Sequence, residues 1–96
     1  MAERTAENVV LIGKKPVMNY VVACMTVFNS GVKQVTIKAR GRAIPRAVDT
    51  VELIRRAFIK NLVIPKGGIN ISTQELTGQD GRRTNVSTID ISIAKP

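Results

Sequence analysis

The stretch that decides the fold is Val9-Val10-Leu11-Ile12-Gly13-Lys14-Lys15-Pro16. Its first four residues are all apolar, which is typical of a β-strand covered on both faces. Pro16 suits the first turn of a helix, where the N–H that proline lacks would have no intrahelical partner. Two lysines at such a strand-to-helix turn lie where backbone N–H groups point outward, an arrangement suited to phosphate. The alternative is that both are simply solvated loop charges.

The next segments repeat the same pattern. The uncharged residues from Pro16 to about Ser30 predict a helix that stops at Gly31. The stretch from Val32 to Ala39 predicts a strand, because apolar and polar residues alternate along it. Arg40-Gly41-Arg42 is then a second basic turn before another helix.

That second helix is expected from about Ala43 to Lys60, with Pro45 tolerated because it falls in the first turn. Helical spacing gathers one apolar stripe, which consists of Ile44, Ala47, Val48, Val51, Ile54 and Phe58. Leu53 lies on the opposite, polar side, where an exposed leucine gives a weak indication of a contact surface.

The two basic turns should lie side by side. A strand–helix–strand unit with short turns is right-handed and makes the two strands parallel neighbours. Both strand-to-helix turns then lie at the carboxyl ends of the strands, at one edge of the sheet. Residues 13–16 and 40–42 therefore bring four cations and two positive helix ends to one surface.

The last third of the chain predicts a β-hairpin from Ile69 to Ala94. A three-residue loop, Gln79 to Gly81 with Gly81 in the left-handed conformation, pairs Ile71 with Ile89 and Ile69 with Ile91. We favour this register because it gathers one apolar face, whereas a two-residue Asp-Gly loop does not. The polar sequence beyond that base predicts an arm that projects from the body, with Arg82 and Arg83 near its tip. Basic ribbon tips suit a DNA groove.

The charge of the chain favours polyanionic partners. Lysine and arginine number 15 against seven acidic residues, a net charge of +8. No acidic residue occurs between Glu7 and Asp49, an interval that holds Lys14, Lys15, Lys33, Lys38, Arg40, Arg42 and Arg46. A region so one-sided creates a positive field that favours nucleic acid first and anionic membrane surface second.

Several other functions are disfavoured by the composition. The chain has no histidine and one cysteine, Cys24, which removes most zinc sites and Ser/His or Cys/His catalysis. The carboxylates Asp49, Glu52 and Asp90 show no paired spacing or metal-ligand pattern, so a hydrolase is disfavoured. We therefore expect no metal, no cofactor and no enzymatic activity. A membrane role is weak because no basic amphipathic helix presents a large apolar face.

The length of 96 residues corresponds to one domain. We expect residues 1–7 to form a flexible tail and residues 8–96 a single domain, with the hairpin arm at about 69–94. The polar N-terminal segment, with Glu3 and Glu7, does not have the pattern of a signal peptide, which favours a cytoplasmic protein.

The sequence resembles the Alba family of small archaeal chromatin proteins, over residues 8 to about 93. The resemblance rests on NVVLIGKKPVMNYV (residues 8–21), on VTIKARGRAI with RAVDTVE (residues 35–44 and 46–52), and on QDGR with VSTIDI (residues 79–82 and 86–91). Two departures are Pro45, where relatives often have a serine that can cap the helix, and a less charged segment from Asn61 to Gly68.

The resemblance implies an α/β fold of the α+β sandwich type, in the order strand, helix, strand, helix, strand, strand. A four-stranded mixed sheet would carry two helices on one face and a protruding hairpin, like the C-terminal domain of translation initiation factor three. It also implies a homodimer. Lys14 corresponds to an acetylation site in some members, so an acetyltransferase and a deacetylase are implied as partners. Phe58 corresponds to a contact between dimers. Because helical spacing puts Phe58 on the core stripe, both assignments stay open.

These inferences converge on a protein that binds double-stranded DNA without sequence preference and that coats and compacts it in the nucleoid. The residues expected to contact phosphates are Lys14, Lys15, Arg40, Arg42, Arg46, Arg82 and Arg83. Contacts between dimers are expected at Phe58 and Leu53. The main alternative is RNA binding within a ribonucleoprotein particle, in RNA stabilisation or processing, because the same cationic face fits an A-form helix.

Overall fold

The computed structural model describes residues 8–96, so the expected flexible tail, residues 1–7, lies outside the described residues. The described chain forms one mixed sheet with the strand order β1-β2-β4-β3. β1 (Val9–Leu11) is parallel to β2 (Gln34–Arg40), whereas β4 (Arg83–Ala94) is antiparallel to both β2 and β3 (Ile69–Thr77). The expected order of elements and the mixed sheet are confirmed.

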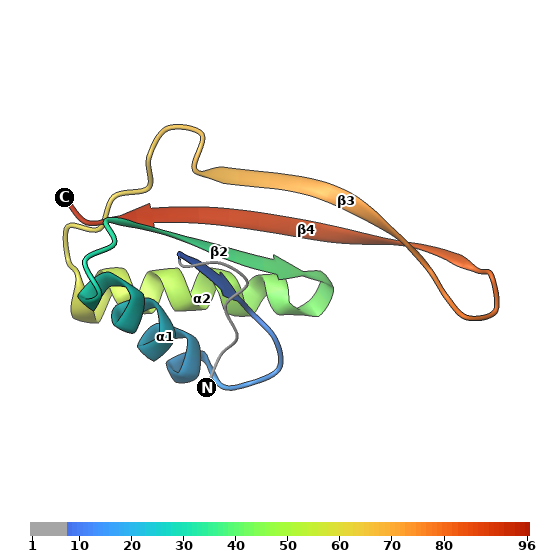
Figure 1. The fold of residues 1–96 in the computed structure, drawn as a ribbon, viewed down its shortest axis with the longest axis horizontal. Coiled ribbons are helices and arrows are strands. Elements are labelled where there is room, and N and C mark those ends of the chain that lie inside the picture. The colour runs from blue at the N-terminus through green and yellow to red at the C-terminus, as the bar shows by residue number, and fades with distance from the viewer. Residues whose placement is uncertain (1–7) are drawn as a thin grey trace.

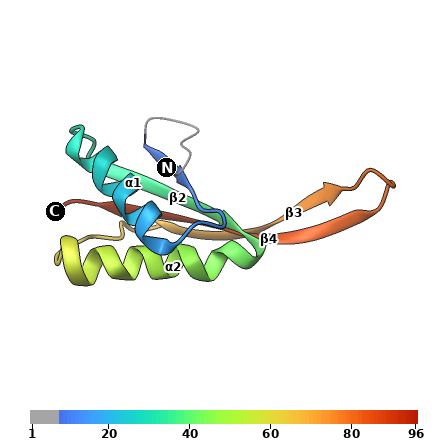
Figure 2. The ribbon, with the colours of Figure 1, turned by 90° about the horizontal axis from the view of Figure 1, so that it is seen from below.

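Both helices cover the same face of the sheet (Figures 1 and 2). α1 (Val17–Asn29) starts directly after Pro16. α2 (Ile44–Leu53) carries Pro45 in its first turn and has no side-chain cap, and the 3₁₀ turn Gly41–Ala43 precedes it. Within residues 8–96, no helix is long and apolar enough to cross a membrane.

The expected helix from 43 to 60 is wrong in its last part. The regular α-helix stops at Leu53, and the π-helical turn Ile54–Phe58 follows. Its wider turn is closed by the N–H of Ile59, which donates to the carbonyl of Ile54, five residues back, at 2.7 Å. The period of 3.6 residues on which the apolar stripe was based therefore ends before Phe58.

The core lies between the helices and one face of the sheet. β2 alternates as predicted, with Val35 and Ile37 buried and the polar residues between them on the other face. The largest buried side chains are Phe28, Ile37, Ile54, Ile93, Val10, Val21, Val27 and Val35. The expectation that the first strand is covered on both faces is wrong. Val10 is buried, but Val9 and Leu11 are only partly buried, because β1 is an edge strand with helices on one side only.

The hairpin has the predicted register. Ile71 pairs with Ile89 and Ile69 with Ile91. The N–H of Gly78 donates to the carbonyl of Arg82 at 2.8 Å, which leaves a three-residue loop, and Gly81 has a φ of 80°. The arm extends well past the helices and gives the molecule a long dimension of 46 Å (Figure 1).

The apolar face at the base of the hairpin is buried on one strand only. Ile89, Ile91 and Ile93 of β4 are buried against the helices. On β3, by contrast, Ile69 is 53% exposed and Ile71 is 78% exposed. Pairing in register therefore did not produce burial, because β3 is the outer strand and the two helices do not reach over it.

Candidate nucleic-acid interface

The two basic turns lie at the end of the body from which the hairpin projects (Figure 1). They follow the neighbouring strands β1 and β2, whose pairing continues to Ile12, where the N–H donates to the carbonyl of Lys38 at 2.9 Å. The side chains of Lys14, Lys15 and Arg42 are exposed there. We name this surface, which is formed by residues 13–16 and 40–42, the basic edge.

A hydrogen bond joins the first basic turn to the helix that follows the second one. Arg46, on the first turns of α2, donates from Nη1 to the carbonyl of Gly13 at 2.6 Å. The predicted proximity of the two turns is confirmed by the parallel pairing of β1 with β2, which both turns directly follow. The bond also gives Arg46 an intramolecular partner that the sequence did not suggest, since this residue was expected to contact phosphate.

The hydroxyl of Tyr20 holds the same loop from the other side. Tyr20 is only 2% exposed, and its Oη accepts the N–H of Gly13 and the N–H of Lys15, each at 2.9 Å. A Cβ at position 13 would come within 3.3 Å of that oxygen, so the close approach is easiest for glycine. These two N–H groups therefore point inward rather than toward a ligand, contrary to the expectation that they would face phosphate. In this loop the exposed side chains of Lys14 and Lys15, rather than these backbone N–H groups, are available to contact phosphate.

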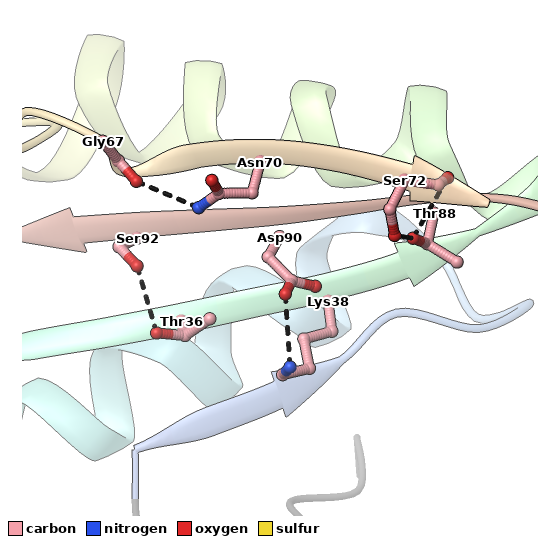
Figure 3. A network of polar contacts seen from close by, with 8 residues as sticks. All are labelled: Thr36, Lys38, Gly67, Asn70, Ser72, Thr88, Asp90 and Ser92. Atoms are coloured by element: carbon pink, nitrogen blue, oxygen red, sulfur yellow. Dashed lines mark hydrogen bonds and ion pairs between the residues drawn. The ribbon is translucent and has the colours of Figure 1, made fainter. Parts of the chain in front are cut away.

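Arg40 connects the basic edge to the base of the arm. It ends β2 on the face opposite the helices, and its Nη1 donates to Oε1 of Gln74 on β3 at 3.4 Å. Further along that face Lys38 is paired with Asp90 at 3.3 Å, and hydroxyl pairs join Thr36 to Ser92 and Ser72 to Thr88 (Figure 3). This open face is thus polar but internally paired, and Lys38 adds little unopposed charge.

The arm holds its two arginines beside two carboxylates. Arg82 Nε lies 3.3 Å from an oxygen of Asp80, and Arg83 Nε lies 3.4 Å from an oxygen of Glu75. All four side chains are mostly exposed, so these pairs are weak and open to competition. The arm tip therefore presents cations without a net positive charge.

The two residues considered for contacts between dimers have different environments. Phe58 is 48% exposed, so its assignment to the core is wrong. Leu53, expected to be an exposed leucine on the polar side, is instead partly buried and packs against the core. Its contribution to an outer surface is correspondingly smaller than the sequence suggested.

Within the described residues, no three His, Cys, Asp or Glu side chains gather in a way that could hold a metal ion. Cys24 lies in the core, and its burial raises the pKa of the thiol to about 12. A thiol held neutral in this way is a poor nucleophile.

Besides the Arg46–Gly13 bond, sequence reasoning missed three features of this surface. The role of Tyr20 has a signal in retrospect, because a tyrosine on the buried side of a helix needs a partner for its hydroxyl. The pairing of Arg83 with Glu75 follows from the hairpin register, which places Glu75 opposite Asn85 and Thr77 opposite Arg83. The contact between Arg40 and Gln74 has no local signal, since it joins strands that are not neighbours in the sheet.

Comparison with known proteins decides the family. The family model described as Alba matches residues 8–66, more than half of the chain. The chain belongs to the Alba family. It is 53% identical, over 90 residues, to a protein of the archaeon Methanocella arvoryzae named DNA/RNA-binding protein Alba, a match that covers 94% of this chain and 92% of the relative.

Solved structures of Alba proteins have the same fold. Alba from Thermoplasma volcanium superposes with a TM-score of 0.83 at 41% identity, covering 92% of this chain and all of that one. ALBA1 from Trypanosoma brucei gives a TM-score of 0.72 at 24% identity, covering 96% of this chain and 72% of the other, a likeness that concerns the fold alone.

Proposed function

We propose that this Alba-family chain is a non-enzymatic nucleic-acid-binding protein that binds double-stranded DNA without sequence preference. The observation that carries the proposal is the basic edge, where Lys14, Lys15 and Arg42 are exposed and the Arg46–Gly13 bond holds the first turn to α2. Its relative from Methanocella arvoryzae is named for binding DNA and RNA. Phosphate contacts of this kind position a protein on a duplex but carry no sequence information.

The footprint on DNA extends from the body along the arm. Arg40 lies between the basic edge and Gln74 at the arm base, and Arg82 and Arg83 extend the row of cations toward the tip. Affinity should fall steeply with salt, because each neutralised phosphate releases a counterion.

The protein acts as a homodimer in this proposal. The exposed Ile71 lines a shallow depression of about 410 Å³ together with Ile44 of α2 and Ile89 of β4. An exposed apolar surface on the outer strand is unfavourable in water and favours coverage by a second copy. A dimer also doubles the net charge and provides two arms.

Dimers then coat and compact DNA in the cytoplasm, where they are associated with the chromosome in the nucleoid. Phe58 is half exposed at the end of the π-helical turn and provides the contact between adjacent dimers, with Leu53 at the end of α2 as a second candidate. Acetylation of Lys14 by an acetyltransferase, reversed by a deacetylase, would weaken binding by removing one charge from the basic edge.

RNA binding is the second candidate, and it is favoured by the name of the Methanocella relative, which includes RNA. An A-form duplex offers phosphates to the same lysine side chains. Lysine side chains on an exposed loop can adapt to either helix geometry. The affinities for DNA and RNA must therefore be compared by measurement.

The test is a salt-titrated binding series on matched DNA duplex, RNA duplex and single strands. Lys14→Gln should lower affinity for duplex DNA about threefold to tenfold at low salt and reduce the slope of log K against log [salt] by about one per subunit. Lys66→Gln is the matched control, because Lys66 precedes β3 at the opposite end of the sheet. Wild-type affinity in a folded Lys14→Gln protein would contradict the assignment, and preference for RNA duplex over DNA would favour the second candidate.

A further inference from the structure

We infer that Tyr20 and Arg46 form a clamp that holds Lys14 in its binding position, with Tyr20 as a positioning residue that does not contact the nucleic acid itself. The role of Lys14 in binding rests on the proposed function, whereas the hydrogen bonds of the clamp do not. The loop clamp is defined by three hydrogen bonds, two accepted by Tyr20 Oη and one donated by Arg46 Nη1.

The clamp fixes the peptide groups on both sides of Lys14. The carbonyl of the Gly13–Lys14 peptide accepts from Arg46, and the N–H of the Lys14–Lys15 peptide donates to Tyr20. Peptide groups are planar, so anchoring both leaves the two backbone dihedrals of Lys14 little freedom. The direction in which the Lys14 side chain leaves the backbone is thereby set before any ligand arrives.

The residues beside Lys14 are held as well. The N–H of Gly13 is the second donor to Tyr20 Oη, and Pro16 restricts Lys15 to extended conformations. Tyr20 can serve as a fixed anchor because its ring is buried in the core, on the face of α1 that packs against the sheet. Arg46 extends the anchoring to α2, the helix that follows the second basic turn.

A preformed loop increases affinity because less conformational freedom is lost on binding. Two contributions to the affinity for nucleic acid can therefore be distinguished, one from charge and one from the fixed geometry of the loop. Lys14 supplies the charge that displaces a counterion, whereas Tyr20 supplies only geometry. Removing the charge of Lys14 should reduce the salt dependence of binding, whereas removing the hydroxyl of Tyr20 should leave it unchanged.

Tyr20→Phe tests the clamp because it keeps the ring and removes only the oxygen. In the free protein, amide hydrogen exchange of Gly13 and Lys15 should accelerate at least tenfold, while the amides in the middle of α1 keep their protection. Affinity for duplex DNA should fall about threefold to tenfold, as expected for lost hydrogen bonds. The salt slope should stay that of the wild type, in contrast to Lys14→Gln. Thr26→Ala is the matched control, since it removes an exposed hydroxyl of the same helix that bonds only to Val22.

Arg46→Met is the second variant. It should lower affinity without changing the salt slope if Arg46 acts through Gly13, whereas a slope lower by about one per subunit would make Arg46 a phosphate contact and remove it from the clamp. The clamp is refuted if the Gly13 and Lys15 amides of Tyr20→Phe exchange at the wild-type rate, or if its DNA affinity is that of the wild type. Failure of wild-type protein to bind any duplex would instead overturn the proposed function, and the exchange result would still stand.

Discussion

Cys24 shows how burial alone sets the chemistry of a single side chain. The thiol is enclosed by apolar neighbours on the inner face of α1, and the pKa is raised to about 12 because the thiolate would lose its hydration there. In the unfolded chain the same thiol titrates near its ordinary value of 9.0.

The stability of the fold should therefore depend on pH in the alkaline range. The pKa is higher in the folded state, so the contribution of Cys24 is complete below pH 9 and is lost as the pH rises toward 12. At pH 10 the loss relative to pH 8 should be about 1 kcal/mol of unfolding free energy. Urea unfolding at both pH values measures it. Cys24→Ala, less stable at pH 8, should lack this part of the pH dependence, and an equal loss in both proteins would contradict the assignment.

The hairpin arm is an element whose charge is balanced within itself. Arg82 is paired with Asp80, and Arg83 with Glu75, so the tip offers two cations and two anions to a ligand. Binding phosphate there requires an exposed ion pair to exchange partners. The arm carboxylates thus limit how much the arm adds to affinity.

Glu75→Gln should release Arg83 and raise affinity for duplex DNA about twofold to fivefold, the range expected from an exposed ion pair. Glu52→Gln changes the net charge equally but lies on α2 beside Arg55, so it serves as the control for unspecific charge gain. Binding measured at one low salt concentration compares the two. Equal gains in both variants would mean that only net charge matters and that the arm pair plays no part.

At the scale of the whole molecule, the outer strand leaves an apolar surface uncovered. The helices pack over β1, β2 and β4, and β3 keeps Ile69 and Ile71 largely in solvent. This follows from the size of the domain, because two short helices cannot cover four strands. A second copy would supply the missing layer.

Ile71→Lys should convert the proposed homodimer into a monomer, because a charge on that surface cannot be buried without a partner. Analytical ultracentrifugation should show the mass halved, and the salt slope for DNA should fall to about half the wild-type value. Val22→Lys is the matched control, since Val22 is also exposed and apolar but lies on α1. A monomeric wild type, or a variant that remains dimeric, would overturn the homodimer proposal.

Much of the fold followed from the sequence because its signals are local. Strand alternation at Val35 and Ile37, the prolines that start both helices, and the glycine-centred loop at Gly81 each constrain the backbone within a few residues. The parallel crossover then placed the two basic turns at one edge without further information. The hairpin register followed from two pairs of isoleucines.

Sequence by itself determined the order of the elements, the pairing of the hairpin and the cations of the basic edge, because each depends on neighbours in the chain or on a general rule of handedness. Only the tertiary structure decided which apolar residues are covered, so Phe58 and Ile71 proved exposed. It alone revealed that Tyr20 and Arg46 hold the Lys14 loop, because those bonds join a turn to the sides of two helices. A periodic pattern indicates the face on which a residue lies, but what packs against that face depends on the position of every other element.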